Sequence, residues 1–406
     1  MKRLAAWLDD ERRYLAAVIG FGLLLRVALV LRTGAGGLSP DAGDWMHVAL
    51  SVATGGGFGG TWRPPGYAAF LAAVFFVFGK SVLAAKLANA ALGAATLFVV
   101  YRAALSLFDR ATARIAVAMM SFYPYLLAYS ADVLSETLLT FLLAASVLAL
   151  VRAAEKPDLK RLALAGFVCG LTALTKSVVL PFFLLAGAWL WARTGRLRAP
   201  LLVALAGALT IAPWSLRNYF HYDKSYVMPV NTPWFSLYGS TCDEALADAS
   251  KGEITKGPGV PEYDQFLPPD WEAVGALPLP ERDKYCKEKV KSWIAANPRK
   301  YASLLWLRLK HFWRLYPIIA YGWQKAAAMA TSGLYIPLAL IGVFLARPFL
   351  GRVSLLLALF AAHTLVHLFF AVTLRYRVPI DPYVMMFAAF ALAEGSRRLR
   401  APKEIK

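Results

Sequence analysis

The stretch YLAAVIGFGLLLRVALVL, residues 14–31, decides the fold class of this 406-residue chain. Apart from Arg26 it contains no charged residue, and an apolar run of about 17–25 residues is long enough to cross a bilayer as a helix. It follows four basic residues and is long for the core of a signal peptide. We therefore interpret it as a retained membrane anchor.

Apolar runs of this kind recur along the chain. The sequence is 59% hydrophobic and 17% charged, whereas soluble domains average about 45–50% apolar and about 25% charged residues. We expect an all-α polytopic membrane protein with about ten transmembrane helices, interfacial helices and a small extracytoplasmic domain. The spans are predicted near residues 14–32, 82–101, 115–131, 133–151, 162–176, 178–192, 199–215, 330–346, 353–373 and 379–394.

The basic residues set the predicted orientation, because cytoplasmic loops are enriched in Lys and Arg. The net charge is +19, and most of the cations lie at the ends of apolar runs. Both chain termini are basic, so both are predicted to be cytoplasmic and the number of crossings to be even. No polar segment carries a basic stripe with interleaved aromatic residues, so a nucleic-acid partner is not expected. We expect a multi-pass protein of the plasma (inner) membrane with its polar working surface outside.

Two apolar segments are predicted not to cross. Residues 65–78 fall short of the ~20 residues that a span needs. Residues 301–316 carry Arg308, Lys310 and Arg314, each costing about 2.5–3.5 kcal/mol at the centre of a span, and are expected to form an amphipathic interfacial helix. The predicted organisation is a transmembrane catalytic core (1–216) with a first outer loop (33–80), an extracytoplasmic domain (217–329), and C-terminal transmembrane helices with a cytoplasmic tail (330–406).

Cysteine usage leaves one question open. Cys169 lies in an apolar run and is expected to be a small buried hydrophobe. Cys242 and Cys286 both fall in the predicted extracytoplasmic domain, where disulfides form. Their spacing alone does not decide whether they are linked.

Two pairs of carboxylates are candidates for catalysis. Asp41 and Asp44 follow Pro40 in the first outer loop and would share one face of a short helix. The alternative is helix capping by one and solvation of the other. Asp132 and Glu136 are four residues apart and are predicted to share one helical face at the outer end of the fourth span, where acidic residues are costly and usually functional. At a helix end, however, they also have access to water.

Cations collect on the same predicted side of the membrane. Any one of them is explained by snorkelling, but several that converge opposite buried carboxylates are better explained by a bound phosphate. The candidates for binding the phosphate of a donor are Arg63, Lys86, Lys176, Arg217, Arg375 and Arg377.

Histidines in the ninth span offer a weaker signal. His363 and His367 are one helical turn apart, a spacing that can bind zinc. No third ligand is evident, so a hydrogen-bonded helix contact is the better interpretation. A divalent cation held by a carboxylate pair stays open.

Several stretches, taken in order, resemble the GT-C superfamily of membrane glycosyltransferases, in the branch of the protein O-mannosyltransferases and the aminoarabinose transferase of lipid A. The resemblance in their order and spacing covers residues 26 to 395, nearly the whole chain. They are PDAGDWMHVA (40–49), GGGF (55–58), RPPGY (63–67), YP (123–124), SADVLSETLLTF (130–141), GLTALTK (170–176), APWSLRNY (212–219) and RYRVPIDP (375–382).

The resemblance implies an enzyme that transfers a sugar, with inversion, from a polyprenyl-phosphate carrier to a lipid, glycan or protein acceptor outside the membrane. By resemblance Asp41 is the catalytic base, Glu136 is the carboxylate that opens the fourth span, and Arg63 contacts the lipid phosphate. There are departures: Trp45 stands where Tyr is common, Lys176 where Arg is common, and Ala42 where the mannosyltransferases have the Glu of an Asp-Glu pair. The large C-terminal soluble domain of this branch is also absent from the sequence.

Two other functions compete with this interpretation. A transporter or flippase for a lipid-linked sugar would place polar residues near the middle of several spans and use broken helix pairs. Most ionisable residues here lie toward span ends instead. A non-catalytic assembly or binding protein is the third possibility. The substitution Asp41→Asn distinguishes a binding protein from an enzyme, because loss of transfer with retained lipid binding would support the enzyme.

Overall fold

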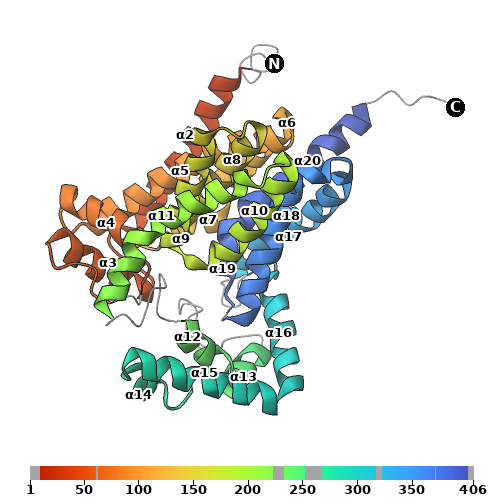
Figure 1. Ribbon diagram of the computed structural model, residues 1–406. Coiled ribbons are helices and arrows are strands. Elements are labelled where there is room, and N and C mark those ends of the chain that lie inside the picture. The colour runs from red at the N-terminus through yellow and green to blue at the C-terminus, as the bar shows by residue number, and fades with distance from the viewer. Residues whose placement is uncertain are drawn as a thin grey trace.

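The computed structural model describes residues 10–60, 63–222, 233–251, 268–316, 322–370 and 372–400. Within these ranges the chain is helical and contains no strand, which confirms the all-α class. The helices form an elongated bundle with a smaller group of helices at one end (Figure 1).

The first half of the bundle follows the apolar runs. Its long helices are α2 (Glu11–Thr33), α5 (Val82–Leu107), α8 (Glu136–Glu155), α9 (Leu159–Thr175), α10 (Leu180–Thr194) and α11 (Arg198–His221), with the shorter α6 (Arg110–Ser121), α7 (Pro124–Ser130) and 3-10 turn η1 (Ser177–Val179) between them. The second half contains α17 (Gly322–Leu345), η2 (Arg347–Phe349), α18 (Leu350–Phe369), α19 (Leu374–Arg377), η3 (Val378–Ile380) and α20 (Asp381–Arg400).

Seven helices of the described chain are long and apolar enough to cross a membrane, or eight if the bent pair α6–α7 is one span. That pair bends by 56° where Pro124 opens α7, because proline cannot continue the preceding helix. The remaining two predicted spans coincide with α9 and α20. These two helices are not among those long and apolar enough to cross a membrane, so their crossing stays a prediction.

Ion pairs tie the start of α2 and the end of α20 to the same end of the bundle. Arg110 at the start of α6 pairs with Glu11, and Arg397 pairs with the neighbouring Asp109 at 2.8 Å. Both helix ends lie at the top of Figure 1, opposite the smaller helical group. This arrangement agrees with an even number of crossings.

The predicted first outer loop folds into two helices, α3 (Pro40–Ala53) and α4 (Pro65–Phe78). Trp45 of α3 and Tyr67 of α4 meet edge to face with ring centroids 5.2 Å apart. Both belong to a buried cluster that also contains Val133 and Leu134, just before α8. This cluster fixes α3 against the start of α8.

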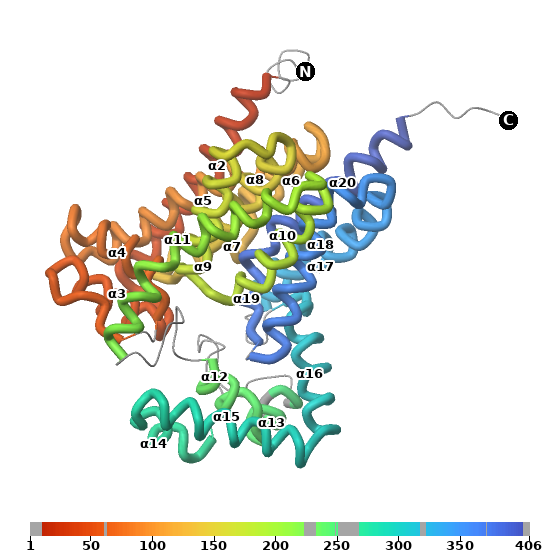
Figure 2. The backbone as a smooth tube through the Cα atoms, in the orientation of Figure 1, coloured from red at the N-terminus to blue at the C-terminus, as the bar shows by residue number. Residues whose placement is uncertain are grey.

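The smaller group consists of α12 (Pro233–Ser240), α13 (Asp243–Lys251), α14 (Trp271–Gly275) and α15 (Leu279–Ala296), with α16 (Pro298–Phe312) running from it to the bundle (Figure 2). Its core contains Phe235, Tyr238 and Cys286. All three cysteines are buried and free, so Cys242 and Cys286 are not linked in this structure.

The helix α16 covers most of the predicted amphipathic segment. Its buried residues are Leu304, Arg308 and Phe312, spaced four apart along the face toward α18. The Arg308 guanidinium donates to the carbonyls of Leu368 and Phe369 at the end of α18. One of the three cations in this segment is therefore part of an internal helix contact.

Glycines bring α9 and α11 into close contact. A Cβ added to Gly166 would lie 2.3 Å from the carbonyl oxygen of Val203, and one added to Gly170 would lie 2.9 Å from that of Gly207. Small residues four apart let two membrane helices approach this closely. Because α9 ends next to Lys176, this contact also fixes the position of that lysine.

Replacing Gly166 with alanine is expected to lower the thermal unfolding temperature of the purified protein. Overpacking a close contact costs about 1–3 kcal/mol, more than the ~1 kcal/mol that alanine gains over glycine in a helix. The matched control is Gly20→Ala in α2, where a Cβ meets nothing within 4 Å. That variant should be as stable as the wild type or more so. Equal stability of both variants would contradict the contact.

Candidate active site

The first part of the site is the N-terminal turn of α3. Pro40 occupies the first helical turn, where its missing N–H is no loss. Asp41 and Asp44 then lie on one face, as their spacing predicts. Both accept from the same nitrogen, Nη2 of Arg63, at 2.7 and 2.8 Å. Arg63 also lies 5.2 Å from the ring centroid of Trp45, which stabilises its position through a cation–π contact.

Arg375 of α19 joins this turn to the start of α8. Its Nη1 donates to Oδ2 of Asp41 at 2.6 Å, while Nε and Nη2 donate to the two carboxylate oxygens of Glu136 at 2.5 and 3.0 Å. Side chains of Arg375 and Glu136 are only 4% and 0% exposed. Bidentate pairing of this kind fixes both groups in orientation as well as distance.

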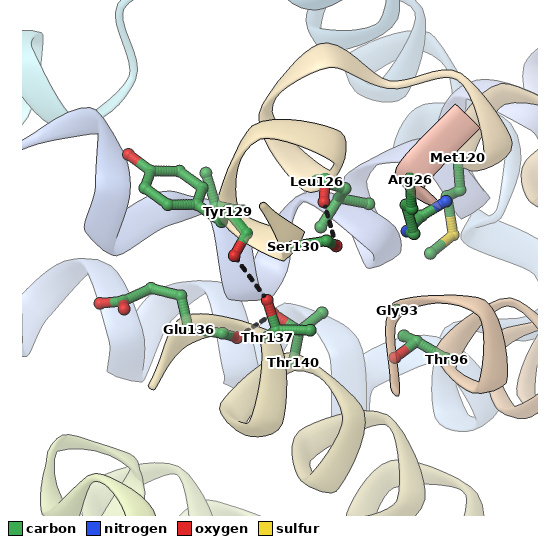
Figure 3. Close-up of a pocket in the computed structure, with 11 residues that line it drawn as sticks. Arg26, Gly93, Thr96, Met120, Leu126, Tyr129, Ser130, Glu136, Thr137 and Thr140 are labelled. Atoms are coloured by element: carbon green, nitrogen blue, oxygen red, sulfur yellow. Dashed lines mark hydrogen bonds between the residues drawn. The ribbon is translucent and has the colours of Figure 1, made fainter. Parts of the chain in front are cut away.

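Glu136 is held from two further sides. It is the first residue of α8, where the helix dipole favours a negative charge. Lys176, between α9 and η1, donates to its Oε1 at 3.1 Å. Thr137 donates to the carbonyl of Tyr129, which ties the first turn of α8 to α7. Figure 3 shows that contact and the Glu136 carboxylate pointing away from the small cavity that Arg26 and Met120 line.

Asp41, Asp44, Arg63, Glu136, Lys176 and Arg375 thus form one continuous set of ion pairs, called the ion-pair network below. Three carboxylates face three cations, so the formal charge of the network is zero. Burial alone would raise the pKa of Asp41. Arg63 and Arg375 outweigh it and hold that pKa below its ordinary value of 3.8.

Asp132 takes a different position from the one expected. It lies in the turn before α8, so it does not share a helical face with Glu136. Its carboxylate accepts from the backbone N–H groups of Ser39 and Val133, which satisfies donors at the turn and fastens the start of α3 to it. Burial raises the pKa of Asp132. The prediction of one shared helical face is therefore wrong, and Asp132 instead holds the N–H of Ser39, the N-cap residue of α3.

Three of the predicted phosphate-binding cations also lie outside the network. Lys86 donates to the carbonyls of Gly34 and Gly36 after the end of α2. Arg217 donates to the carbonyl of Gly59. Arg377 pairs with Asp381 at 3.0 Å, with both side chains fully buried. Each cation satisfies backbone acceptors or a structural carboxylate, so the structure brings together only Arg63, Lys176 and Arg375 of the six.

Tyr376 is the residue of the site that sequence reasoning missed. The ammonium group of Lys176 lies 4.7 Å from the ring centroid of Tyr376. His367 stacks on the same Tyr376 ring, with the two ring planes 9° apart. His363 contacts the Tyr376 carbonyl through Nε2 at 2.8 Å, the hydrogen-bonded helix contact expected for this histidine. The sequence did offer one indication of Tyr376: it lies between Arg375 and Arg377, two residues that were already candidates for the site.

No group of three or more His, Cys, Asp or Glu side chains that could hold a metal ion occurs among the residues the structure describes. His363 and His367 accordingly lack a third ligand there. The carboxylates of Asp41 and Glu136 are occupied by cationic side chains. In this structure the guanidinium and ammonium groups of the site therefore pair with its carboxylates.

Comparison with known proteins bears on this geometry in two ways. Residues 62–216 match the profile of the family described as dolichyl-phosphate-mannose-protein mannosyltransferase. This segment includes Arg63, Glu136 and Lys176 of the network. No match was found among curated proteins.

Among solved structures, the oligosaccharyltransferase of Archaeoglobus fulgidus shares the fold. Its apo form superposes with a TM-score of 0.58 at 14% identity, covering 97% of this chain and 52% of that one. Its complex tethered to an acceptor peptide gives 0.58 at 12% identity, covering 97% and 51%. This chain spans about half the length of those structures. ArnT from Cupriavidus metallidurans bound to undecaprenyl phosphate gives only 0.43 at 14% identity, covering 95% and 79%. The expected resemblance to the GT-C superfamily is confirmed at the level of the fold and, over residues 62–216, of the family profile.

Proposed function

We propose that this protein is an inverting glycosyltransferase that moves a sugar from a polyprenyl-phosphate carrier to an acceptor on the extracytoplasmic side of the plasma membrane. The observation that carries the proposal is the bridge by Arg375 between Asp41 and Glu136. It places a candidate base next to three clustered cations. The description of the matching family, which names a dolichyl-phosphate sugar, supports the same class of donor.

The donor phosphate is assigned to Arg63, Lys176 and Arg375. These three cations come from the loop before α4, the turn after α9, and α19. A phosphodiester accepts hydrogen bonds from guanidinium and ammonium groups in the way that Asp41 and Glu136 accept them now. The isoprenoid tail then lies along the apolar outer surface of the bundle.

The reaction requires one base and one charge-stabilising group. An acceptor hydroxyl attacks the anomeric carbon while the bond from that carbon to the phosphate oxygen breaks, and the configuration inverts. Asp41 takes the proton of the attacking hydroxyl. The electron pair of the broken bond leaves on the polyprenyl phosphate, whose added negative charge the three cations stabilise. Glu136 orients Arg375 and Lys176.

The position of the network supports the proposed extracytoplasmic side. It lies where α3, α8 and α19 meet, away from the end of the bundle where Glu11 and Arg397 form ion pairs. We assign that other end, with its basic connections, to the cytoplasm. The network and the helices α12–α16 then face the exterior.

Replacing Asp41 with Asn should abolish transfer while the protein still folds. Loss of a general base lowers the rate about 10²–10⁴-fold. The Asp41 side chain is 26% exposed, and the buried Arg375 keeps its pair with Glu136, so the substitution leaves no buried charge unpaired. The measurement is transfer from a panel of radiolabelled polyprenyl-phosphate hexoses in membranes, with Asp243→Asn as the control. Unchanged transfer in Asp41→Asn would rule out this residue as the base.

Glu136→Gln is expected to lower both activity and stability, because removing one partner of a buried ion pair costs about 3–5 kcal/mol. The matched control is Glu155→Gln at the other end of α8, where the side chain is 52% exposed. Thermal unfolding in detergent and the transfer assay together give the readout. A Glu136→Gln variant as stable as Glu155→Gln would contradict the buried network.

The pH dependence of kcat/KM tests the protonation state of Asp41. Because Arg63 and Arg375 depress its pKa below 3.8, the carboxylate stays ionised as pH falls from neutrality. The acid limb of the profile should therefore begin only below about pH 4. An acid limb centred between about pH 6 and 7 would point to a different base.

Lys176→Met should weaken binding of polyprenyl phosphate about tenfold or more, since a hydrogen bond to a charged group contributes about 1.5–3 kcal/mol. Binding is measured on the protein in nanodiscs with a fluorescent polyprenyl phosphate. Lys80→Met, at an exposed lysine after α4, is the control. Equal affinity of the two variants would remove Lys176 from the phosphate site.

A further inference from the structure

A second cavity lies between the first outer loop and the α12–α15 group. Its volume is about 580 Å³, within the range of about 300–1,000 Å³ typical of small-molecule sites. Asp44 and Arg63 line it from the first outer loop, and Phe235, Trp271, Glu272 and Arg282 line it from the smaller group. We propose that this cavity binds the acceptor and that the acceptor presents an uncharged sugar to it. The inference rests on the proposed function.

The cavity opens directly onto the ion-pair network. Arg63 lines it and at the same time donates to Asp41 at 2.7 Å. Asp44 lines it and accepts from the same guanidinium nitrogen. A ligand held here therefore lies one side chain away from the proposed base.

The charges that line the cavity cancel. Asp44 and Glu272 supply two negative charges, and Arg63 and Arg282 supply two positive ones. The lining therefore has no excess of either charge that would favour an ionic ligand over a neutral one. Carboxylates accept hydrogen bonds and guanidinium groups donate them, which suits the hydroxyls of a neutral sugar, since each hydroxyl does both.

An aromatic platform completes the lining. Trp271 stacks on Phe235 with ring centroids 3.7 Å apart and planes 14° apart, and the Arg282 guanidinium lies over Phe235 at 5.1 Å. A Cβ on Gly239 would lie 2.5 Å from the Trp271 ring, so this glycine lets the indole lie flat on α12. A fixed, flat apolar surface next to polar groups matches a pyranose ring, which has an apolar C–H face and a polar rim.

A peptide acceptor fits the cavity less well. One common mode of peptide binding adds a strand to a sheet edge, and the structure has no strand in the ranges it describes. A helical peptide needs a long apolar groove, whereas charged side chains surround this aromatic platform. The lining therefore favours a compact sugar over a peptide.

The test is ligand binding to the full-length protein in nanodiscs, followed by saturation-transfer difference NMR. The probes are cellobiose, gentiobiose, mannobiose and trehalose, together with a neutral hexapeptide that contains threonine. We expect at least one disaccharide, and not the peptide, to receive saturation from the wild type. Trp271→Ala should weaken that binding about tenfold through loss of the aromatic face. Glu272→Gln, at an exposed side chain where folding is not at risk, should weaken it about fivefold.

Two controls separate this inference from the proposed function. Trp306→Ala, at a tryptophan that is 57% exposed on α16, should bind the disaccharide as the wild type does. Asp41→Asn should also bind it normally while losing transfer. If Asp41→Asn keeps transfer but Trp271→Ala loses disaccharide binding, the proposed base is wrong and the sugar site stands. Preference for the peptide, no binding of any disaccharide, or unchanged binding in both Trp271→Ala and Glu272→Gln would overturn the inference.

Discussion

The bridge that Arg375 forms between Asp41 and Glu136 is the constraint on which the candidate site depends. Its partners are 334 and 239 residues away in sequence, so helices from the beginning, the middle and the end of the chain must all be in place before it can form. Each of the three charges would be costly alone in a largely buried position. Together they offset one another, and the bundle is held in the one arrangement that satisfies them.

The rest of the fold supports that arrangement by close packing and by capping. The Gly166 and Gly170 contact with α11 sets the position of α9 and hence of Lys176. Asp132 fastens the start of α3 through the N–H of Ser39. Lys86 similarly stabilises the segment after α2, because its ammonium group donates to the carbonyls of Gly34 and Gly36, which lack helical partners. Asp132 and Lys86, which the sequence made candidates for the site, thus hold in place the segment that leads into α3.

The sequence predicted the helices and their order because the length of an apolar run reports directly on membrane crossing. It also indicated Asp41 and Glu136 as candidates, and these are the two carboxylates that Arg375 joins in the structure. It did not separate Arg375 from Arg377, although residues two apart on a helix face different sides, and only Arg375 reaches the network. Asp132 was predicted to be helical but lies in the turn before α8. The start of this helix depends on tertiary contacts, because the Asp132 carboxylate accepts from the N–H of Ser39, which is distant in sequence. The cavity beside Trp271 depends on how α12, α14 and α15 pack, which no local pattern reports.

The contacts of Arg377 bear on how the proposed donor phosphate reaches Arg375. Arg377 pairs with Asp381 and donates to the carbonyl of Phe312 at the end of α16, and Tyr123 donates to the same Asp381. These contacts hold the short helix α19 in place on the C-terminal side of Arg375. Under the proposed function, the donor phosphate would therefore meet an Arg375 side chain whose C-terminal backbone is held in place by the contacts of Arg377. Under that proposal the phosphate would compete with Asp41 for Nη1 of Arg375, while Glu136 keeps the guanidinium oriented through Nε and Nη2. Specificity would then depend on which anion can replace the Asp41 carboxylate at this nitrogen.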